Sequence, residues 1–259
     1  MKILIVGCSF SEDINLDNVT SWSYLLRNHL KNENIEIINL SKSGQGNGII
    51  SDVVVEYVNT HDVDLVLIQW SAFTRIFKNK RLPKEWYKYK NLEWSEDGNN
   101  MDILSKEAIE HSLIKINQTI DCLSSKNIKY KMWFGWQQVY PEQIKEYGLD
   151  DLLVKIENDS NFLLFSQTTI YDYELENYGL FSKSNYILTL LKYIGYKKED
   201  YLHPATKWGG MTEYIRMNLN TDKYINKYDM HPSTMAHFTF FNNIIKPLFP
   251  INEHTIKII

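Results

Sequence analysis

The chain begins with a short apolar stretch that ends abruptly at a glycine and is followed by two serines. The stretch covers residues 3–6, Ile-Leu-Ile-Val, and Gly7, Ser9 and Ser11 come after it. Continuous β-branched and apolar stretches are typical of strands that are buried on both faces of a parallel sheet, and glycine commonly ends them. Because ligands of open α/β sheets bind outside the carboxyl ends of the strands, Ser9 is a candidate site residue.

Buried strands and amphipathic helices alternate along the rest of the chain. Further strands are predicted over residues 35–39, 64–70, 129–136 and 162–165, and helices over 22–30, 49–59, 103–124, 141–157 and from 233 onward. This order predicts an α/β fold with a mainly parallel sheet of about five strands and helices on both faces. Segments 73–101 and 168–226 lack the periodicity, so we interpret them as two insertions into a single domain spanning 1–259.

The composition excludes several classes of function. A hydrophobic content of 44% over 259 residues is ample for a core, while the net charge of −4 argues against a nucleic-acid partner. No stretch approaches the length of a membrane span, which predicts no membrane partner. The two cysteines, Cys8 and Cys122, show no metal-ligand spacing and suggest a reducing compartment. We therefore expect a soluble, cytoplasmic protein.

A glycine-rich loop at residues 41–48, which we call the glycine loop, follows the predicted strand at 35–39. It contains Gly44, Gly46 and Gly48 and leads into the helix predicted over 49–59. Glycines allow positive φ and a close approach of the backbone to a ligand. Their spacing fits neither the dinucleotide fingerprint nor the phosphate-binding loop, so a nucleotide-binding protein is the weakest of our hypotheses.

Residues with the chemistry of a serine hydrolase are spread along the chain. Ser9 is the candidate nucleophile, His231 the candidate base, and Asp229 a candidate for holding the imidazole in the productive tautomer. The predicted donors to an oxyanion are the backbone N–H groups of Ser9 and Gly44, together with a side chain from Asn47 or Ser71. His231 comes just before the helix that is predicted to start at Ser233.

Three short motifs, in this order, resemble those of the SGNH hydrolases. Residues 7–11, Gly-Cys-Ser-Phe-Ser, resemble the GDSL block with Cys8 in the usual Asp position; the glycine loop resembles the glycine block, and residues 229–232, Asp-Met-His-Pro, resemble the Asp/His block. The resemblance covers these motifs, the end of the strand at 64–70 and the last thirty residues, but neither insertion. It implies a flavodoxin-like three-layer α/β/α sandwich that hydrolyses or transfers acyl esters, often acetyl groups on carbohydrates. No metal or organic cofactor is expected.

The chain also departs from the family pattern. The third block of the family usually reads Gly-x-Asn-Asp, whereas residues 69–72 read Gln-Trp-Ser-Ala, so Ser71 or Asn47 must replace the missing oxyanion asparagine. The family more often has two residues between its Asp and His, whereas Asp229 and His231 are separated by one, so a backbone carbonyl is an alternative partner for His231.

The residues expected to contact the substrate lie at the ends of predicted strands. They are Gln69, Trp70, Arg75 and Trp136, of which Arg75 is a candidate for an anionic group and Trp136 for stacking on a sugar ring. The leading hypothesis is a serine esterase or O-deacetylase acting on a small-molecule or carbohydrate ester. An O-acyltransferase of the same fold and a binding or structural protein that has lost catalysis are the alternatives.

Overall fold

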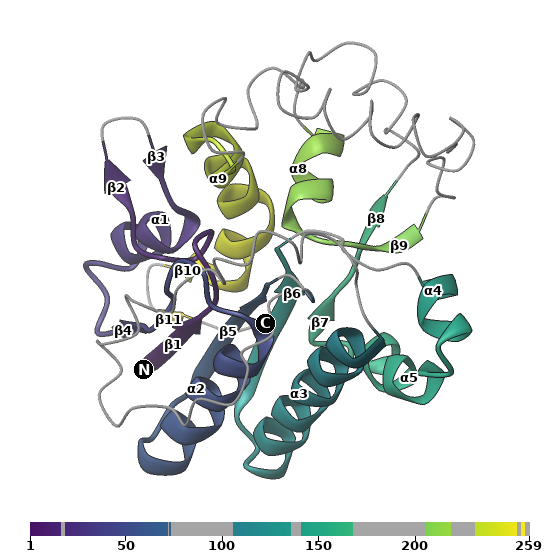
Figure 1. The fold of residues 1–259 in the computed structure, drawn as a ribbon. Coiled ribbons are helices and arrows are strands. Elements are labelled where there is room, and N and C mark those ends of the chain that lie inside the picture. The colour runs from purple at the N-terminus through teal and green to yellow at the C-terminus, as the bar shows by residue number, and fades with distance from the viewer. Residues whose placement is uncertain are drawn as a thin grey trace.

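The structure, a computed structural model, describes residues 1–16, 19–71, 73, 106–135, 141–167, 206–218, 231–252 and 255–256. At its centre lies a parallel five-stranded sheet in the order β4-β1-β5-β6-β7 (Figure 1). The strands are β1 (Lys2–Val6), β4 (Glu36–Asn39), β5 (Leu65–Trp70), β6 (Lys129–Phe134) and β7 (Phe162–Leu163). The predicted parallel α/β sheet is thus confirmed. Its strand order is the flavodoxin-like one, with the topological switch point between β1 and β5.

Helices cover both faces of the sheet and give the molecule three layers (Figure 1). Helices α2 (Asn47–Thr60), α3 (Lys106–Ser125), α4 (Pro141–Glu146) and α5 (Asp150–Asn158) pack on one face. Helices α1 (Trp22–His29), α8 (Met211–Asn218) and α9 (Thr234–Phe240) pack on the other. A π-helical turn, Phe241–Ile245, and a 3-10 turn, Lys246–Leu248, continue α9.

The continuous apolar strands are explained by burial on both faces. Alternate side chains of β1 and β5 enter opposite cores: Leu4, Val6, Val66 and Ile68 pack against α2 and α3, and Ile3, Ile5, Leu65 and Leu67 pack against α1 and α9. The prediction of a single helix over 141–157 is wrong. The chain turns at Gly148, where φ is +66°, and the segment forms two helices, α4 and α5.

Short antiparallel pairs of strands form separate two-stranded sheets beside the central one. They are β2 (Asn15–Leu16) with β3 (Val19–Thr20), β8 (Phe165–Gln167) with β9 (Thr206–Gly209), and β10 (Ile251–Asn252) with β11 (Thr255–Ile256). Element β9 and helix α8 fall within the segment predicted as the second insertion, and α8 adds Met211 and Ile215 to the core. Apart from these two elements and Gly210 between them, that segment lies outside the described residues, as does all of the first segment except Phe73.

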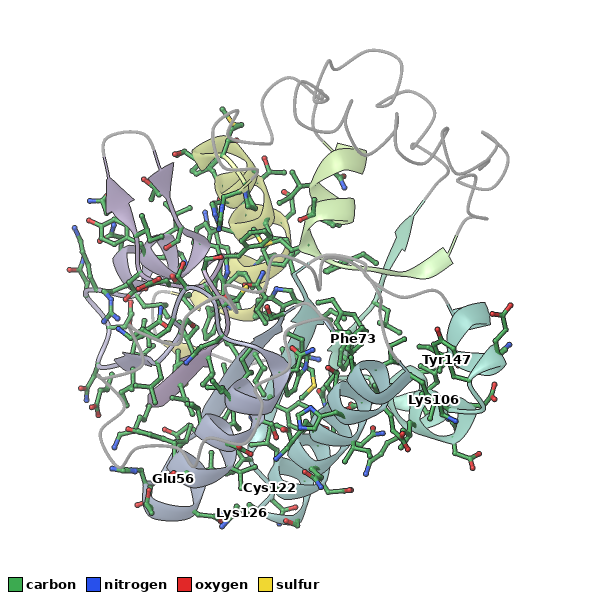
Figure 2. The ribbon with its side chains drawn as sticks, in the orientation of Figure 1. Glu56, Phe73, Lys106, Cys122, Lys126 and Tyr147 are labelled. Atoms are coloured by element: carbon green, nitrogen blue, oxygen red, sulfur yellow. The ribbon has the colours of Figure 1, made fainter. Side chains whose placement is uncertain are left out.

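In the part of the chain that the structure describes, no helix combines the length and apolar character needed to cross a membrane. Figure 2 shows how α3 runs relative to the strand ends: Lys106 lies at the end near Phe73, and Cys122 and Lys126 lie at the other. Phe73 follows β5 and packs against Phe134, the last residue of β6. The carboxyl ends of the central strands and the start of α3 therefore share one edge of the molecule.

Candidate active site

Ser9 lies in a tight turn that begins directly after β1. The turn is closed by a hydrogen bond from the Ser11 backbone N–H to the Cys8 carbonyl oxygen, at 3.0 Å. Gly7 has no room for a side chain, because a Cβ there would lie 2.9 Å from Ser11 Oγ and 3.1 Å from Gln69 Cβ. The close packing of β1 against β5 thus fixes the turn at the switch point of the sheet. Ser9 itself is only 5% exposed.

His231 meets Ser9 from the other end of the chain. Its Nε2 lies 2.8 Å from Ser9 Oγ, within hydrogen-bond distance. The Phe10 ring meets the imidazole edge to face, with ring centroids 5.3 Å apart. In the tautomer in which Nε2 accepts, Ser9 Oγ donates to it at a distance that is short enough for direct proton transfer to the imidazole.

The position of His231 depends on how α9 packs against the start of α1. Ser233 caps α9, accepting a hydrogen bond from the Ala236 N–H at 3.2 Å. From the first turns of α9, Thr234 Oγ1 accepts from the Thr20 N–H at 3.1 Å, and His237 Nδ1 accepts from the Trp22 N–H at 3.3 Å. These bonds hold the beginning of α9, and with it His231, against β3 and the start of α1.

His237 is a second histidine of this region, and it is buried. Burial, and then the charge of the neighbouring His231, lower the pKa of His237 from 6.5 to about 3. A neutral ring also suits its contact, because Nδ1 can accept the Trp22 N–H only while it carries no proton. His237 therefore stays neutral at neutral pH, and it is His231 whose ring nitrogen lies beside Ser9 Oγ.

The low pKa of His237 predicts a pH dependence of stability. Between about pH 6.5 and 3 the unfolded chain binds a proton at His237 that the folded chain does not. The folded state therefore becomes less stable as the pH falls through this window. We expect His237 to contribute a slope of about 1.4 kcal/mol per pH unit to the free energy of unfolding. Denaturant titrations of the wild type and of His237→Asn, which keeps an acceptor near Nδ1, measure it. Equal slopes in the two proteins would contradict the burial of a neutral His237.

Two of the residues predicted to bind an oxyanion are joined by a hydrogen bond. Asn47, the first residue of α2, is fully buried, and its Oδ1 accepts from the backbone N–H of Ser71 at 2.7 Å. This bond fixes the orientation of the amide, and Asn47 Nδ2 has no partner among the described residues. Asn47 therefore keeps a donor that is buried, oriented and unused at the edge of the sheet that carries Ser9.

Gly44 lies in the glycine loop with a φ of +81°, a conformation that favours glycine. The loop is tied to the end of β1 by a hydrogen bond from the Lys42 N–H to the Gly7 carbonyl oxygen, at 3.2 Å. The start of α2 and the loop before it are thereby brought beside the Ser9 turn. The predicted set of Ser9, Gly44, Asn47, Ser71 and His231 comes together at one edge of the sheet.

The structure contradicts the substrate-binding role that was predicted for Gln69 and Trp70. Both side chains are fully buried. Trp70 Nε1 points to Met132 Sδ at 3.4 Å, and Gln69 bonds to Ser11 and contacts Met211. Strand β5 is enclosed on both faces to its last residue, so neither side chain has surface left for a substrate.

Asp229, Arg75 and Trp136 lie outside the described residues. The sequence reasoning also missed two buried polar residues near the site, Ser11 and His237. A signal was present for His237, because it shares a helical face with Phe240 and Phe241, which are both in the core. For Ser11 the signal was Gly7, four residues earlier, because a glycine permits close approach of other side chains.

Comparison with known proteins gives matches only among solved structures. No family model matches the chain, and no curated protein matches it. An esterase from Pseudoalteromonas sp. is 17% identical over 62% of this chain and 73% of its own, with a TM-score of 0.35. An acetylxylan esterase from Geobacillus stearothermophilus is 14% identical over 95% and 92%, with a TM-score of 0.45. A GDSL-like lipase from Bacteroides thetaiotaomicron is 12% identical over 95% and 86%, with a TM-score of 0.41.

Proposed function

We propose that this protein is a serine-dependent ester hydrolase of the SGNH type, with Ser9 as nucleophile and His231 as general base. The observation that carries the proposal is the 2.8 Å separation of Ser9 Oγ and His231 Nε2. A serine hydroxyl is a weak nucleophile until an adjacent base takes its proton. Residues so far apart in the sequence meet here in the geometry that this activation requires.

The chemistry then follows in two halves. Ser9 Oγ attacks the ester carbonyl carbon while its proton passes to His231 Nε2, which gives a tetrahedral oxyanion. The oxyanion collapses, the bond to the alcohol oxygen breaks, and His231 donates its proton to the departing alcohol. Water attacks the resulting acyl-serine with His231 again as base, the carboxylic acid leaves, and Ser9 regains its proton.

The oxyanion is stabilised by donors at the start of α2 and in the Ser9 turn. We assign Asn47 Nδ2 the role that the third-block asparagine has in the family pattern, because the Ser71 N–H holds the amide with its donor side unused. The backbone N–H groups of Ser9 and Gly44 complete the proposed hole. Donors fixed in a buried site stabilise developing charge without reorganising during the reaction.

Three further residues belong to the proposal on the strength of the sequence. Asp229 is expected to accept the Nδ1–H of His231 and so to hold the reactive tautomer. Arg75 and Trp136 are expected to contact the substrate, which we propose is an acylated small molecule or carbohydrate. Their substitution tests these roles once an activity has been measured.

The test is an assay of ester hydrolysis by the purified full chain. We expect release of acetate from p-nitrophenyl acetate above the buffer rate, and from acetylated sugars in a panel of candidate substrates. Free acid formed in water alone supports a hydrolase, whereas acetyl transfer to an added sugar in preference to water would indicate the transferase. No reaction with any activated ester at high protein concentration would contradict the proposed function.

A further inference from the structure

Gln69, the residue before the end of β5, joins the Ser9 turn to the start of α8. Its Oε1 accepts a hydrogen bond from Ser11 Oγ at 2.5 Å and lies 3.9 Å from Cys8 Sγ. Its Nε2 lies 3.5 Å from Met211 Sδ, at the start of α8. Cys8 and Ser11, which flank Ser9 and Phe10 in the chain, are thus both in contact with the buried Oε1 of Gln69.

Two glycines pack closely against the Gln69 side chain. On one side, a Cβ at Gly7 would lie 3.1 Å from Gln69 Cβ; on the other, a Cβ at Gly135 would lie 3.4 Å from Gln69 Nε2 and 3.6 Å from a ring carbon of Phe10. Gly7 and Gly135, which directly follow β1 and β6, let the backbone lie close to Cβ and Nε2 of Gln69, respectively. Because Gln69 is fully buried, it does not contact a substrate, and it can affect the reaction only through the positions of the residues that it contacts.

We propose that Gln69 is a positioning residue, which holds the Ser9 turn at hydrogen-bond distance from His231 through its bond to Ser11. The inference rests on the proposed function, because it concerns the same nucleophile. Ser11 closes the turn through its backbone N–H and anchors it through its hydroxyl, so losing the Gln69 acceptor frees the turn at one end. A buried hydroxyl left without its partner also favours rearrangement of the turn.

A double-mutant cycle with Gln69→Met and Ser11→Ala tests the coupling. Methionine matches glutamine in length and fills the same space, and it offers Ser11 only a weak sulfur acceptor in place of the amide oxygen. We expect each single variant to lower kcat by about 10- to 100-fold with little change in KM, because a small displacement of a reacting group costs rate and not binding. The double variant should lose no more than the worse single variant, since both changes remove the same bond.

Tyr130→Phe is the matched control. It removes a hydrogen bond of 2.7 Å between a buried side chain and Asp159 near the amino end of β6, away from the site. We expect it to change the melting temperature by an amount comparable to Ser11→Ala and to leave kcat unchanged. If Tyr130→Phe lowers kcat as much as Ser11→Ala does, the effect of Gln69 is one of stability alone and the positioning role is refuted.

A second readout does not depend on activity. Crystal structures of the wild type and of Gln69→Met give the distance from Ser9 Oγ to His231 Nε2, which we expect to exceed hydrogen-bond reach in the variant. An unchanged distance would overturn the positioning role whether or not the protein hydrolyses esters. Conversely, a Ser9-dependent activity with wild-type kcat in both single variants would refute the role of Gln69 and leave the proposed function standing.

Discussion

Replacement of Ser9 by alanine is expected to abolish hydrolysis of an activated acetyl ester, with a fall in kcat of at least about 1,000-fold. The change removes one oxygen atom, the one that lies 2.8 Å from His231 Nε2. Because the backbone bond that closes the turn joins Cys8 and Ser11, the fold survives the substitution. Circular dichroism and the melting temperature verify this, and initial rates measured with p-nitrophenyl acetate give the effect.

His231→Ala should lower the rate to a similar extent, because a nucleophile without its base gains little from being in place. The double variant Ser9→Ala/His231→Ala should be no slower than either single one, since residues that act as a unit are not additive. His61→Ala is the control: His61 is an exposed histidine that stacks on Tyr57 at the end of α2. A wild-type rate in Ser9→Ala would refute the nucleophile.

Asn47→Asp is expected to have the next largest effect, a fall in kcat of about 100- to 1,000-fold with little change in KM. The carboxylate keeps an oxygen for the Ser71 N–H but replaces the Nδ2 donor with a second oxygen, which repels a developing oxyanion.

Ser71→Ala separates the two residues that were candidates for this donor. It removes the Ser71 hydroxyl and keeps the backbone N–H that orients Asn47. If Asn47 is the side-chain donor, the alanine variant loses well under the roughly 100-fold that removal of an oxyanion donor costs. The opposite ranking, with a large loss of kcat in Ser71→Ala and a small one in Asn47→Asp, would identify Ser71 as the side-chain donor to the oxyanion.

The sheet was predictable because its strands are buried on both faces. Continuous apolar stretches such as residues 3–6 and 65–68 have few other uses in a chain of mixed composition, and their alternation with helices determines the parallel arrangement. The division between α4 and α5 was missed because Gly148 interrupts the helical pattern without disturbing its apolar spacing. The spacing of apolar residues indicates which face of a helix is buried, but it does not indicate where the helix ends.

The site was predictable in part, for a related reason. A serine after one strand and a histidine just before α9 are brought to the same edge by the topology, and the structure places Ser9 and His231 in contact. Gln69 and Trp70 were assigned to the substrate because they end a strand at that edge. Position along a strand does not reveal what covers it, and the neighbour Met211 comes from a segment without recognisable periodicity.

The central claim, that Ser9 is a nucleophile activated by His231, is tested most directly by covalent labelling with a fluorophosphonate probe. Such probes phosphonylate activated serines, and digestion followed by mass spectrometry locates the adduct. We predict a single adduct on Ser9 in the wild type, its absence in Ser9→Ala, and much slower labelling in His231→Ala. A wild-type protein that stays unmodified at high probe concentration, or is modified at another serine, would contradict the account.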